Sequence, residues 1–511
     1  MPLQNGCSIN TAPPEEEEEE EDCELLLPLH TAPPYCCSSR LNLAVLMFFG
    51  FAVVYGLRVN LSVAMVAMVN NTETDPATNI SNSSKHVCPV PQTNQSSPFS
   101  PKDGAPVYQW DSKVQGWLLG AFFFGYLCTQ IPGGYLAGHY GGTKFLGVGV
   151  LGTAALTLLT PLAAQWGQHW LFALRALEGF GEGVTFPAMM AIWARWAPPL
   201  ERSRLMTFSG SGANFGAFVA LPLTGFICDT LGWPWVFYLC GGGGCLWAVF
   251  WFALVADDPR THKRISDEER GYIISTIGAQ GTGHGWSLPL WSMVRSVPLW
   301  SIIVTQMCSN WSYYTLLTST PIYMDHVLHF DLQANGLLSA LPYLGGFVVS
   351  SLAGVAADLL IERRVFSVTV TRKLFTAVGL VLPSVFLVCV TYIGCSHVYT
   401  VAFLTLSTTT GGISAAGVYM NQMDIAPRFA GFLLGITNTF GTIPGVVAPI
   451  VTGYFTEDRS LDGWRTVFWL SAAIQVAGAA IFTVFGSGKL QDWAMTDEDR
   501  AARKRTSSIL S

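Results

Sequence analysis

The sequence predicts an all-α, polytopic membrane protein with twelve transmembrane helices in two six-helix halves. Half of its 511 residues are hydrophobic and only 12% are charged, a composition too apolar for a soluble protein of this size. Apolar runs of about 20 residues, the length that spans a bilayer as a helix, recur along the chain. A sequence pattern from the first half also recurs in the second, which indicates a duplication.

Twelve runs are apolar enough to cross a membrane as helices. Segment 257–297 is polar and charged and separates six runs from six more, so we expect a cytosolic linker there. The runs are Leu43–Ala67, Gln115–Ala137, Phe145–Ala164, Trp170–Trp193, Leu205–Cys228, Trp235–Val255, Leu299–Tyr323, Ala334–Leu359, Leu374–Ile393, Tyr399–Met420, Phe432–Tyr454 and Val467–Phe485. The predicted domains are a cytosolic tail at 1–40, six-helix bundles at 41–256 and 298–487, and a second cytosolic tail at 488–511.

The two halves share a pattern at the step from their fifth helix to their sixth. Leu221–Phe226 recurs with one insertion as Ala448–Tyr454, and the Gly-Trp pair at 232–233 recurs at 463–464. Both copies occupy the same place in their half, so the duplication is predicted to be in parallel orientation.

The distribution of Lys and Arg predicts that both termini are cytosolic. Most basic residues fall in the loops on that side, and few fall in the loop at 70–112 or in the other outer loops, which is the positive-inside pattern. The net charge of −7 comes largely from nine acidic residues in Glu15–Glu24, so the remainder is near neutral and gives no indication of a nucleic-acid partner. The outer loop is predicted to be glycosylated at sequons whose asparagines are Asn70, Asn79, Asn82 and Asn94.

Four ionisable residues interrupt the apolar runs. Arg58 lies in the first run, and Arg175, Glu178 and Glu182 lie in the fourth. The i, i+3, i+7 spacing puts the last three on one helix face. Because each charge at the bilayer centre costs about 2.5–3.5 kcal/mol, that face is expected to turn away from lipid. Two arginines and two carboxylates in a shared interior predict an anion site with a proton relay, and so a proton-coupled transporter of organic anions.

Longer motifs resemble an anion transporter family of the major facilitator superfamily, one that includes vesicular glutamate transporters and sodium-phosphate type members. The matching segments are Tyr55–Ser62, Gln130–Gly134, Arg175–Ala188, Trp196–Ser203 and Gly435–Gly445. The resemblance implies the major facilitator fold and transport by alternating access, with no enzymatic activity and no cofactor beyond protons as coupling ions. One departure is Met190, which stands where the vesicular relatives usually have His.

Within this family, Cys36–Leu43 and Asn310-Trp311 with Tyr314–Leu317 most resemble the lysosomal sialic acid/proton symporters. That resemblance implies a multi-pass protein of the lysosomal membrane that exports sialic acid and other acidic monosaccharides to the cytosol, with synaptic vesicles and the plasma membrane as further locations. The alternative within the family is a transporter of acidic amino acids (glutamate, aspartate) or of inorganic anions (nitrate, phosphate). An intramembrane hydrolase is disfavoured, because Gly412–Gly417 misses the Gly-x-Ser-x-Gly elbow by one residue and no metal-ligand spacing appears.

Each charged residue has a functional and a structural interpretation. Arg58 and Arg175 are candidates to bind a substrate carboxylate bidentately, or each neutralises a carboxylate in helix packing. Glu178 and Glu182 are the proton-coupling candidates. Burial disfavours the charged carboxylate and a neighbouring arginine favours it, so a substrate that engages Arg175 would promote proton uptake and make binding of the two cooperative. The alternative is a permanent buried ion pair.

Aromatic residues in the same runs would line the cavity and stack against a sugar or hydrogen-bond it, although packing is an equal alternative for each. The candidates are Tyr55, Phe122, Phe123, Tyr126, Tyr313 and Tyr314. Asn438 would meet substrate hydroxyls or bond a neighbouring helix. The glycines at 179, 181 and 183 are expected to allow close helix packing rather than to form a nucleotide loop.

The N-terminal tail contains Glu21–Leu27, in which acidic residues precede leucines. The segment resembles the acidic dileucine signal that sorting adaptors bind in the cytosol, and it predicts traffic to lysosomes. The signal residues would be Asp22, Leu25, Leu26 and Leu27. Beyond adaptors, the expected partners are the organic anion substrate, protons and membrane lipid.

Overall fold

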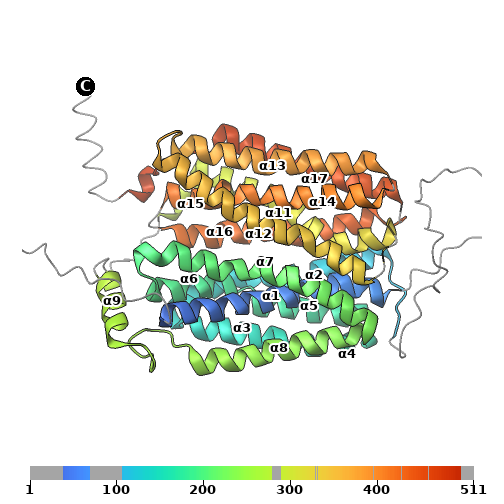
Figure 1. The fold of residues 1–511 in the computed structure, drawn as a ribbon, viewed down its shortest axis with the longest axis horizontal. Coiled ribbons are helices and arrows are strands. Elements are labelled where there is room, and N and C mark those ends of the chain that lie inside the picture. The colour runs from blue at the N-terminus through green and yellow to red at the C-terminus, as the bar shows by residue number, and fades with distance from the viewer. Residues whose placement is uncertain are drawn as a thin grey trace, which may run out of the picture.

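The computed structural model describes residues 38–69, 106–278, 289–328, 330, 332–394, 396–426, 429–458 and 460–495. Within these ranges the regular structure is helical, apart from an isolated bridge between Val69 and Tyr108. The long helices run roughly parallel and form two stacked bundles, the first in blue to green and the second in yellow to red (Figure 1).

The first bundle contains α1 (Ser39–Met68), α2 (Ser112–Tyr140), α3 (Gly142–Leu158), α4 (Thr160–Trp166), α5 (Gln168–Glu182), α6 (Thr185–Trp196), α7 (Pro199–Thr230) and α8 (Trp233–Leu254). The short helices α9 (Asp267–Gly278) and α10 (Leu290–Val294) lie between the bundles in sequence. The second bundle contains α11 (Val297–His326), α12 (Leu332–Glu362), α13 (Val368–Ile393), α14 (His397–Gly411), the 3-10 helix η2 (Gly412–Ala416), α15 (Val418–Ile425), α16 (Ala430–Phe455) and α17 (Leu461–Phe485), and a last 3-10 turn, η4, covers Asp492–Ala494.

The helices follow the twelve predicted runs. In the described part of the chain nine spans are long and apolar enough to cross a membrane, or ten if the bent α3–α4 pair is one span. The other two runs are α5–α6 and α11. The first carries the charged residues of the fourth run, and the second contains a series of buried Ser and Thr side chains. The mean hydropathy of these two runs is lower than that of the other ten because they carry polar side chains into the interior.

Three of the predicted continuous helices are broken. α3 and α4 meet at an angle of 49°, where Pro161 in the first turn of α4 favours a new helix start. α5 ends at Glu182, and the next residue is Gly183, where a side chain would collide with Thr129 of α2. The third break separates α14 from α15, where glycines flank η2. Hydropathy alone does not reveal such breaks, because the apolar composition continues through them.

We name the two ends of the molecule by what they carry: the linker end bears α9, and the loop end lies where α1 stops and α2 begins (Figure 1). At the loop end, one hydrophobic cluster combines both bundles and includes Met65, Trp110, Tyr323 and Trp464. At the linker end each bundle has its own cluster, one around Trp193 and one that remains within the second bundle. The bundles are therefore joined most extensively at the loop end.

The predicted sequence repeat has a structural counterpart. Trp233 begins α8, and Trp464 lies in the first turn of α17. Both follow the fifth membrane path of their bundle, and both are buried in the loop-end cluster. The repeated Gly-Trp pairs thus occupy equivalent positions, at the start of the sixth membrane-spanning path of each bundle.

The linker helix α9 is fixed to the first bundle. Glu269 accepts hydrogen bonds from the main-chain N–H of Ser39 at 2.9 Å and of Arg40 at 3.1 Å, the first residues of α1. The fully buried Arg40 also pairs with Glu269 and with Glu201 of α7. A carboxylate at a helix N-terminus satisfies N–H groups that have no partner within the helix.

Candidate functional site

A buried ion pair joins Arg58 of α1 to Glu182 of α5. The Nε of Arg58 donates to Glu182 Oε1 at 2.9 Å, and Nη2 contacts the same oxygen. Arg58 is 6% exposed and Glu182 is fully buried. Within the described part of the chain, Glu182 Oε2 has no hydrogen-bond partner. Half of this carboxylate is therefore free to bond an incoming group or to take up a proton.

Four aromatic rings surround the Arg58 guanidinium. Its central carbon lies 4.5 Å from the ring centre of Tyr55, 4.6 Å from Tyr126, 5.1 Å from Phe122 and 5.9 Å from Phe123. These distances allow cation–π attraction, which strengthens when the cation is shielded from water. All four rings belong to the residues predicted to line a substrate cavity.

The second bundle reaches this aromatic group through α11. The Tyr314 ring lies 4.6 Å from Phe123, and Tyr313 packs 5.5 Å from Tyr314. The predicted aromatic residues therefore meet at one place, on the boundary between the bundles.

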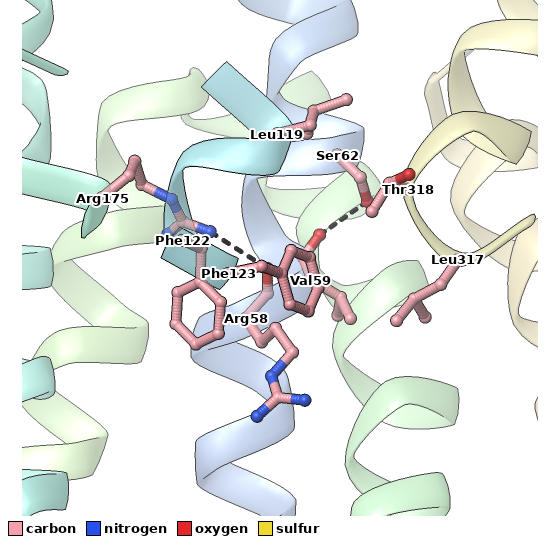
Figure 2. Close-up of a pocket in the computed structure, with 9 residues that line it drawn as sticks. All are labelled: Arg58, Val59, Ser62, Leu119, Phe122, Phe123, Arg175, Leu317 and Thr318. Carbon is pink, nitrogen blue, oxygen red and sulfur yellow. Dashed lines mark hydrogen bonds between the residues drawn. The ribbon is translucent and has the colours of Figure 1, made fainter. Parts of the chain in front are cut away.

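Arg175 has a different role from Arg58. Its Nη1 donates to Glu178 Oε2 at 2.6 Å, and its Nη2 donates to the main-chain carbonyl of Arg58 at 3.1 Å. A longer bond of 3.4 Å reaches the carbonyl of Leu57. Figure 2 shows the Arg175 guanidinium directed at the main-chain carbonyl of Arg58, while the Arg58 side chain points the other way. The two guanidinium groups do not form a joint clamp in this conformation, and Arg175 ties α5 to α1.

Glycines allow α2 and α5 to pack closely enough to bring these groups together. A Cβ at Gly125 would collide with the carbonyl of Ala176, and one at Gly179 would collide with the carbonyl of Phe122. This confirms the predicted close-packing role of the glycines in the fourth run.

Glu178 faces the break between α3 and α4. Its Oε1 accepts a hydrogen bond from Thr160 Oγ1 at 3.2 Å, and its main-chain carbonyl accepts one from Thr153 Oγ1 at 2.9 Å. The two glutamates of α5 thus lie in different surroundings: Glu182 beside the aromatic group and Glu178 beside threonines.

The cavity next to Arg58 is about 10 Å³, room for roughly one water molecule. This conformation is therefore closed around the site, since an organic anion needs far more space. The lining residues, drawn in Figure 2, are Arg58, Val59, Ser62, Leu119, Phe122, Phe123, Arg175, Leu317 and Thr318.

Asn438 bonds across the boundary between the bundles. Its Nδ2 donates to Gln130 Oε1 of α2 at 2.8 Å, and Gln130 Nε2 donates to Thr442 Oγ1 at 2.7 Å. The helix–helix bond that was the alternative for Asn438 is thus present. A second polar pair was not predicted: Tyr419 donates to Asn310 Oδ1 at 2.7 Å. The sequence signal available for each of these two bonds was a polar side chain inside an apolar run.

The remaining predicted positions divide in two. Met190 packs against the linker-end cluster of the first bundle. The sorting residues Asp22, Leu25, Leu26 and Leu27 and the sequon residues Asn70, Asn79, Asn82 and Asn94 lie outside the described residues. Over the described ranges no group of three His, Cys, Asp or Glu side chains could hold a metal ion.

The fold and the buried charged site are those of a membrane carrier, and the chain belongs to the Major Facilitator Superfamily, whose profile matches residues 47–449. Human Sialin is 48% identical over 480 residues, which cover 92% of this chain and 94% of that protein. Sheep Sialin is 49% identical, over 91% of this chain and 92% of its own length. The human "Probable small intestine urate exporter" is 39% identical, over 90% of this chain and 92% of its own length. The predicted family is thereby confirmed, and the chain is a transporter rather than an enzyme.

Solved structures agree with the fold. A bacterial homolog of the human lysosomal transporter Spinster, in an inward-facing and unoccupied conformation, has a TM-score of 0.66 at 12% identity and covers 90% of this chain and 99% of its own. A D-xylose-proton symporter has a TM-score of 0.59 at 14% identity, and the match covers 89% of this chain and 100% of the symporter chain. At these identities the likeness concerns the fold alone, and it confirms the predicted major facilitator architecture.

Proposed function

We propose that this protein is a proton-coupled symporter that exports sialic acid and other acidic monosaccharides from the lysosome to the cytosol by alternating access. The observation that carries the proposal is the buried Arg58–Glu182 pair within an aromatic group at the boundary between the bundles. Support also comes from human and sheep Sialin, at 48% and 49% identity over nearly the whole chain.

The substrate carboxylate is expected to bind Arg58. A guanidinium offers several N–H donors in a planar fork that matches a carboxylate, and the Arg58 fork engages only one oxygen of Glu182. The rings of Tyr55 and Tyr126 flank the guanidinium and can stack against the apolar face of a sugar or donate to its hydroxyls. Arg175, bonded to main-chain carbonyls, supports the site by fixing α1 against α5.

Coupling follows from competition for Arg58. When a substrate carboxylate takes over the guanidinium, Glu182 loses its counter-charge while it remains buried, and its neutral, protonated form is then favoured. Proton binding in turn frees Arg58 for the substrate. Since linkage is reciprocal, each ligand raises the affinity for the other, which is the requirement for symport.

Alternating access requires that contacts between the bundles break on one side. At the loop end the bundles share a hydrophobic cluster and the ion pair between Lys113 and Glu457, whose Nζ and Oε2 are 2.8 Å apart. These contacts would separate when the site opens to the lysosomal lumen. The linker end would face the cytosol, as the positive-inside pattern predicts.

Neutral polar groups favour a sugar acid over a small inorganic anion. Asn310 lies one helical turn before Tyr314 on α11 and is bonded to Tyr419. Amide and hydroxyl groups suit the hydroxyls of a monosaccharide. Related chains named for phosphate transport, such as mouse "Sodium-dependent phosphate transport protein 3" at 38% identity, keep inorganic phosphate as the alternative substrate to test.

Location is part of the proposal. We assign the protein to the lysosomal membrane, with synaptic vesicles and the plasma membrane as further locations, and with sorting adaptors bound to Asp22 and Leu25–Leu27. Glycosylation is proposed at the asparagines of the loop 70–112.

The deciding experiment is uptake by purified protein in proteoliposomes with pH and voltage set independently. Labelled sialic acid should accumulate when the outside is acidic, and unlabelled sialic acid and glucuronic acid should compete with it. Glutamate, nitrate and phosphate are the discriminating competitors. If one of these anions were accumulated by the pH gradient and sialic acid were not, the proposed substrate would be wrong.

A further inference from the structure

We propose that Thr160 sets the proton affinity of Glu178 and thereby makes Glu178 a reversible proton carrier in the transport cycle. This inference rests on the proposed function, because it concerns the proton that such a symporter moves. The side chain acts through Glu178, so Thr160 is a positioning residue.

The geometry begins with the break between α3 and α4. Thr160 is the first residue of α4, immediately after the 49° bend. The bend turns its hydroxyl to Glu178, and Oγ1 lies 3.2 Å from Oε1. Both side chains are fully buried, so neither has bulk water as an alternative partner.

The other oxygen of Glu178 is occupied by Arg175, whose Nη1 donates at 2.6 Å. A guanidinium can only donate, so it stabilises the charged carboxylate most strongly and cannot accept the hydrogen of the carboxylic acid O–H. A hydroxyl has one donor and two acceptor lone pairs. It can donate to the carboxylate and, after rotation, accept from the protonated acid.

Thr160 therefore supplies a partner in both protonation states. A buried polar group without a partner is costly, and a residue that must gain and lose a proton in each cycle needs a partner before and after. The charged groups near Glu178 in the described chain are Arg175 on its own helix, Glu182 one turn further, and Arg58 of α1, which pairs with Glu182. From α3, Thr157 also faces the carboxylate, but its hydrogen is donated to the carbonyl of Thr153 at 2.8 Å.

The test compares isosteric variants in the full-length protein. Thr160→Val keeps the shape and removes the hydroxyl, and Thr160→Ser keeps the hydroxyl. Thr153→Val is the matched control: its hydroxyl is equally buried and bonds Glu178, but at the main-chain carbonyl rather than the carboxylate. Thr160→Ala is a second variant without the hydroxyl, in case the valine prevents folding.

The readout is the pH dependence of sialic acid exchange in proteoliposomes with equal pH on both sides. Both protonation states lose a partner, but the hydrogen bond to the charged form is the stronger of the two, so the protonated form is favoured and the pH midpoint for Thr160→Val should move upward by roughly one unit. Thr160→Ala should shift in the same direction. Thr160→Ser and Thr153→Val should stay within about 0.3 unit of the wild-type midpoint, a shift of roughly twofold in proton affinity.

Gradient-driven accumulation gives a second readout. If Glu178 retains its proton at neutral pH, the empty carrier returns slowly to its starting conformation. Gradient-driven accumulation by Thr160→Val should therefore fall more than its rate of sialic acid exchange. An unchanged midpoint in Thr160→Val, an equal shift in Thr153→Val, or no rescue by serine would each overturn the inference and leave the proposed function standing. Absence of pH-dependent sialic acid uptake by the wild-type protein would instead overturn both.

Discussion

Glu182→Gln is the most direct test of coupling through the Arg58 pair. Glutamine resembles the protonated acid in shape and charge, so the variant should bind substrate without proton uptake at this position. Arg58 would lose its counter-charge, and breaking a buried pair by removing one partner costs about 3–5 kcal/mol. That cost should be smaller here, since the amide oxygen of glutamine still accepts from Arg58 Nε, at the position where Glu182 Oε1 now lies at 2.9 Å.

The magnitude follows from linkage. If one proton binds together with the substrate, substrate affinity rises up to tenfold, about 1.4 kcal/mol, for each unit that the pH falls while Glu182 is charged in the empty carrier. Between pH 7.5 and 5.5 the wild-type protein should therefore gain up to about 100-fold. In Glu182→Gln the change should be less than about threefold, because the competing carboxylate is absent in all conditions.

The assay is equilibrium exchange of labelled sialic acid across this pH range, followed by accumulation under an imposed gradient. Accumulation should fail in Glu182→Gln and in Glu178→Gln, while exchange should survive in at least one of them and so mark the residue whose deprotonation resets the empty carrier. Size-exclusion profiles and melting temperatures check that both variants are folded. Wild-type accumulation and a wild-type pH slope in both would refute the coupling argument and make the glutamates structural.

Three further outcomes are expected. Arg58→Lys keeps the charge but loses the planar fork, and the KM for sialic acid should rise roughly 10- to 100-fold, as for the loss of about 1.5–3 kcal/mol of charge-assisted hydrogen bonding; an unchanged KM would remove Arg58 from the carboxylate site. Gly125→Val should abolish the monodisperse folded protein, because its side chain meets the Ala176 carbonyl, whereas Gly152→Ala, where no atom lies within 4 Å, should melt at or slightly above the wild-type temperature. Replacing Leu25–Leu27 with alanine should move the protein to the cell surface in fluorescence images, and an unchanged lysosomal pattern would show that the sorting signal lies elsewhere.

The helices could be predicted because hydropathy depends on composition within one run. Leu43–Ala67 and Phe432–Tyr454, for example, lie inside α1 and α16. The breaks could not be predicted in the same way, because the bend after α3 and the end of α5 arise from contacts with other helices and from local turn geometry. Gly183 is an example: a side chain at this position would collide with Thr129 of α2, a contact that the sequence around Gly183 does not reveal.

The charged residues of the site could be found from sequence, but their partners could not. The i, i+3 spacing made a pair between Arg175 and Glu178 foreseeable. The pair between Arg58 and Glu182 joins residues 124 positions apart, and the bond from Arg175 to the carbonyl of Arg58 involves a main-chain atom that no residue pattern reports. The two arginines therefore looked equivalent in sequence, whereas in the structure four aromatic rings surround the Arg58 guanidinium and the Arg175 guanidinium lies 5.5 Å from the ring centre of one of them, Phe122.

The two glutamates of α5 also separate once the neighbouring helices are known. They are one helical turn apart and share a face, yet Glu182 contacts the arginine that is expected to bind substrate and Glu178 contacts a threonine at a helix break. A carboxylate whose counter-charge is removed by the substrate is suited to sensing occupancy, because its proton affinity changes only when the site is filled. A carboxylate with a hydroxyl partner in either protonation state is suited to passing the proton on. Both carboxylates are fully buried in this conformation, so under the proposed mechanism proton exchange would wait for the bundles to open, and the proton would move only with the conformational change.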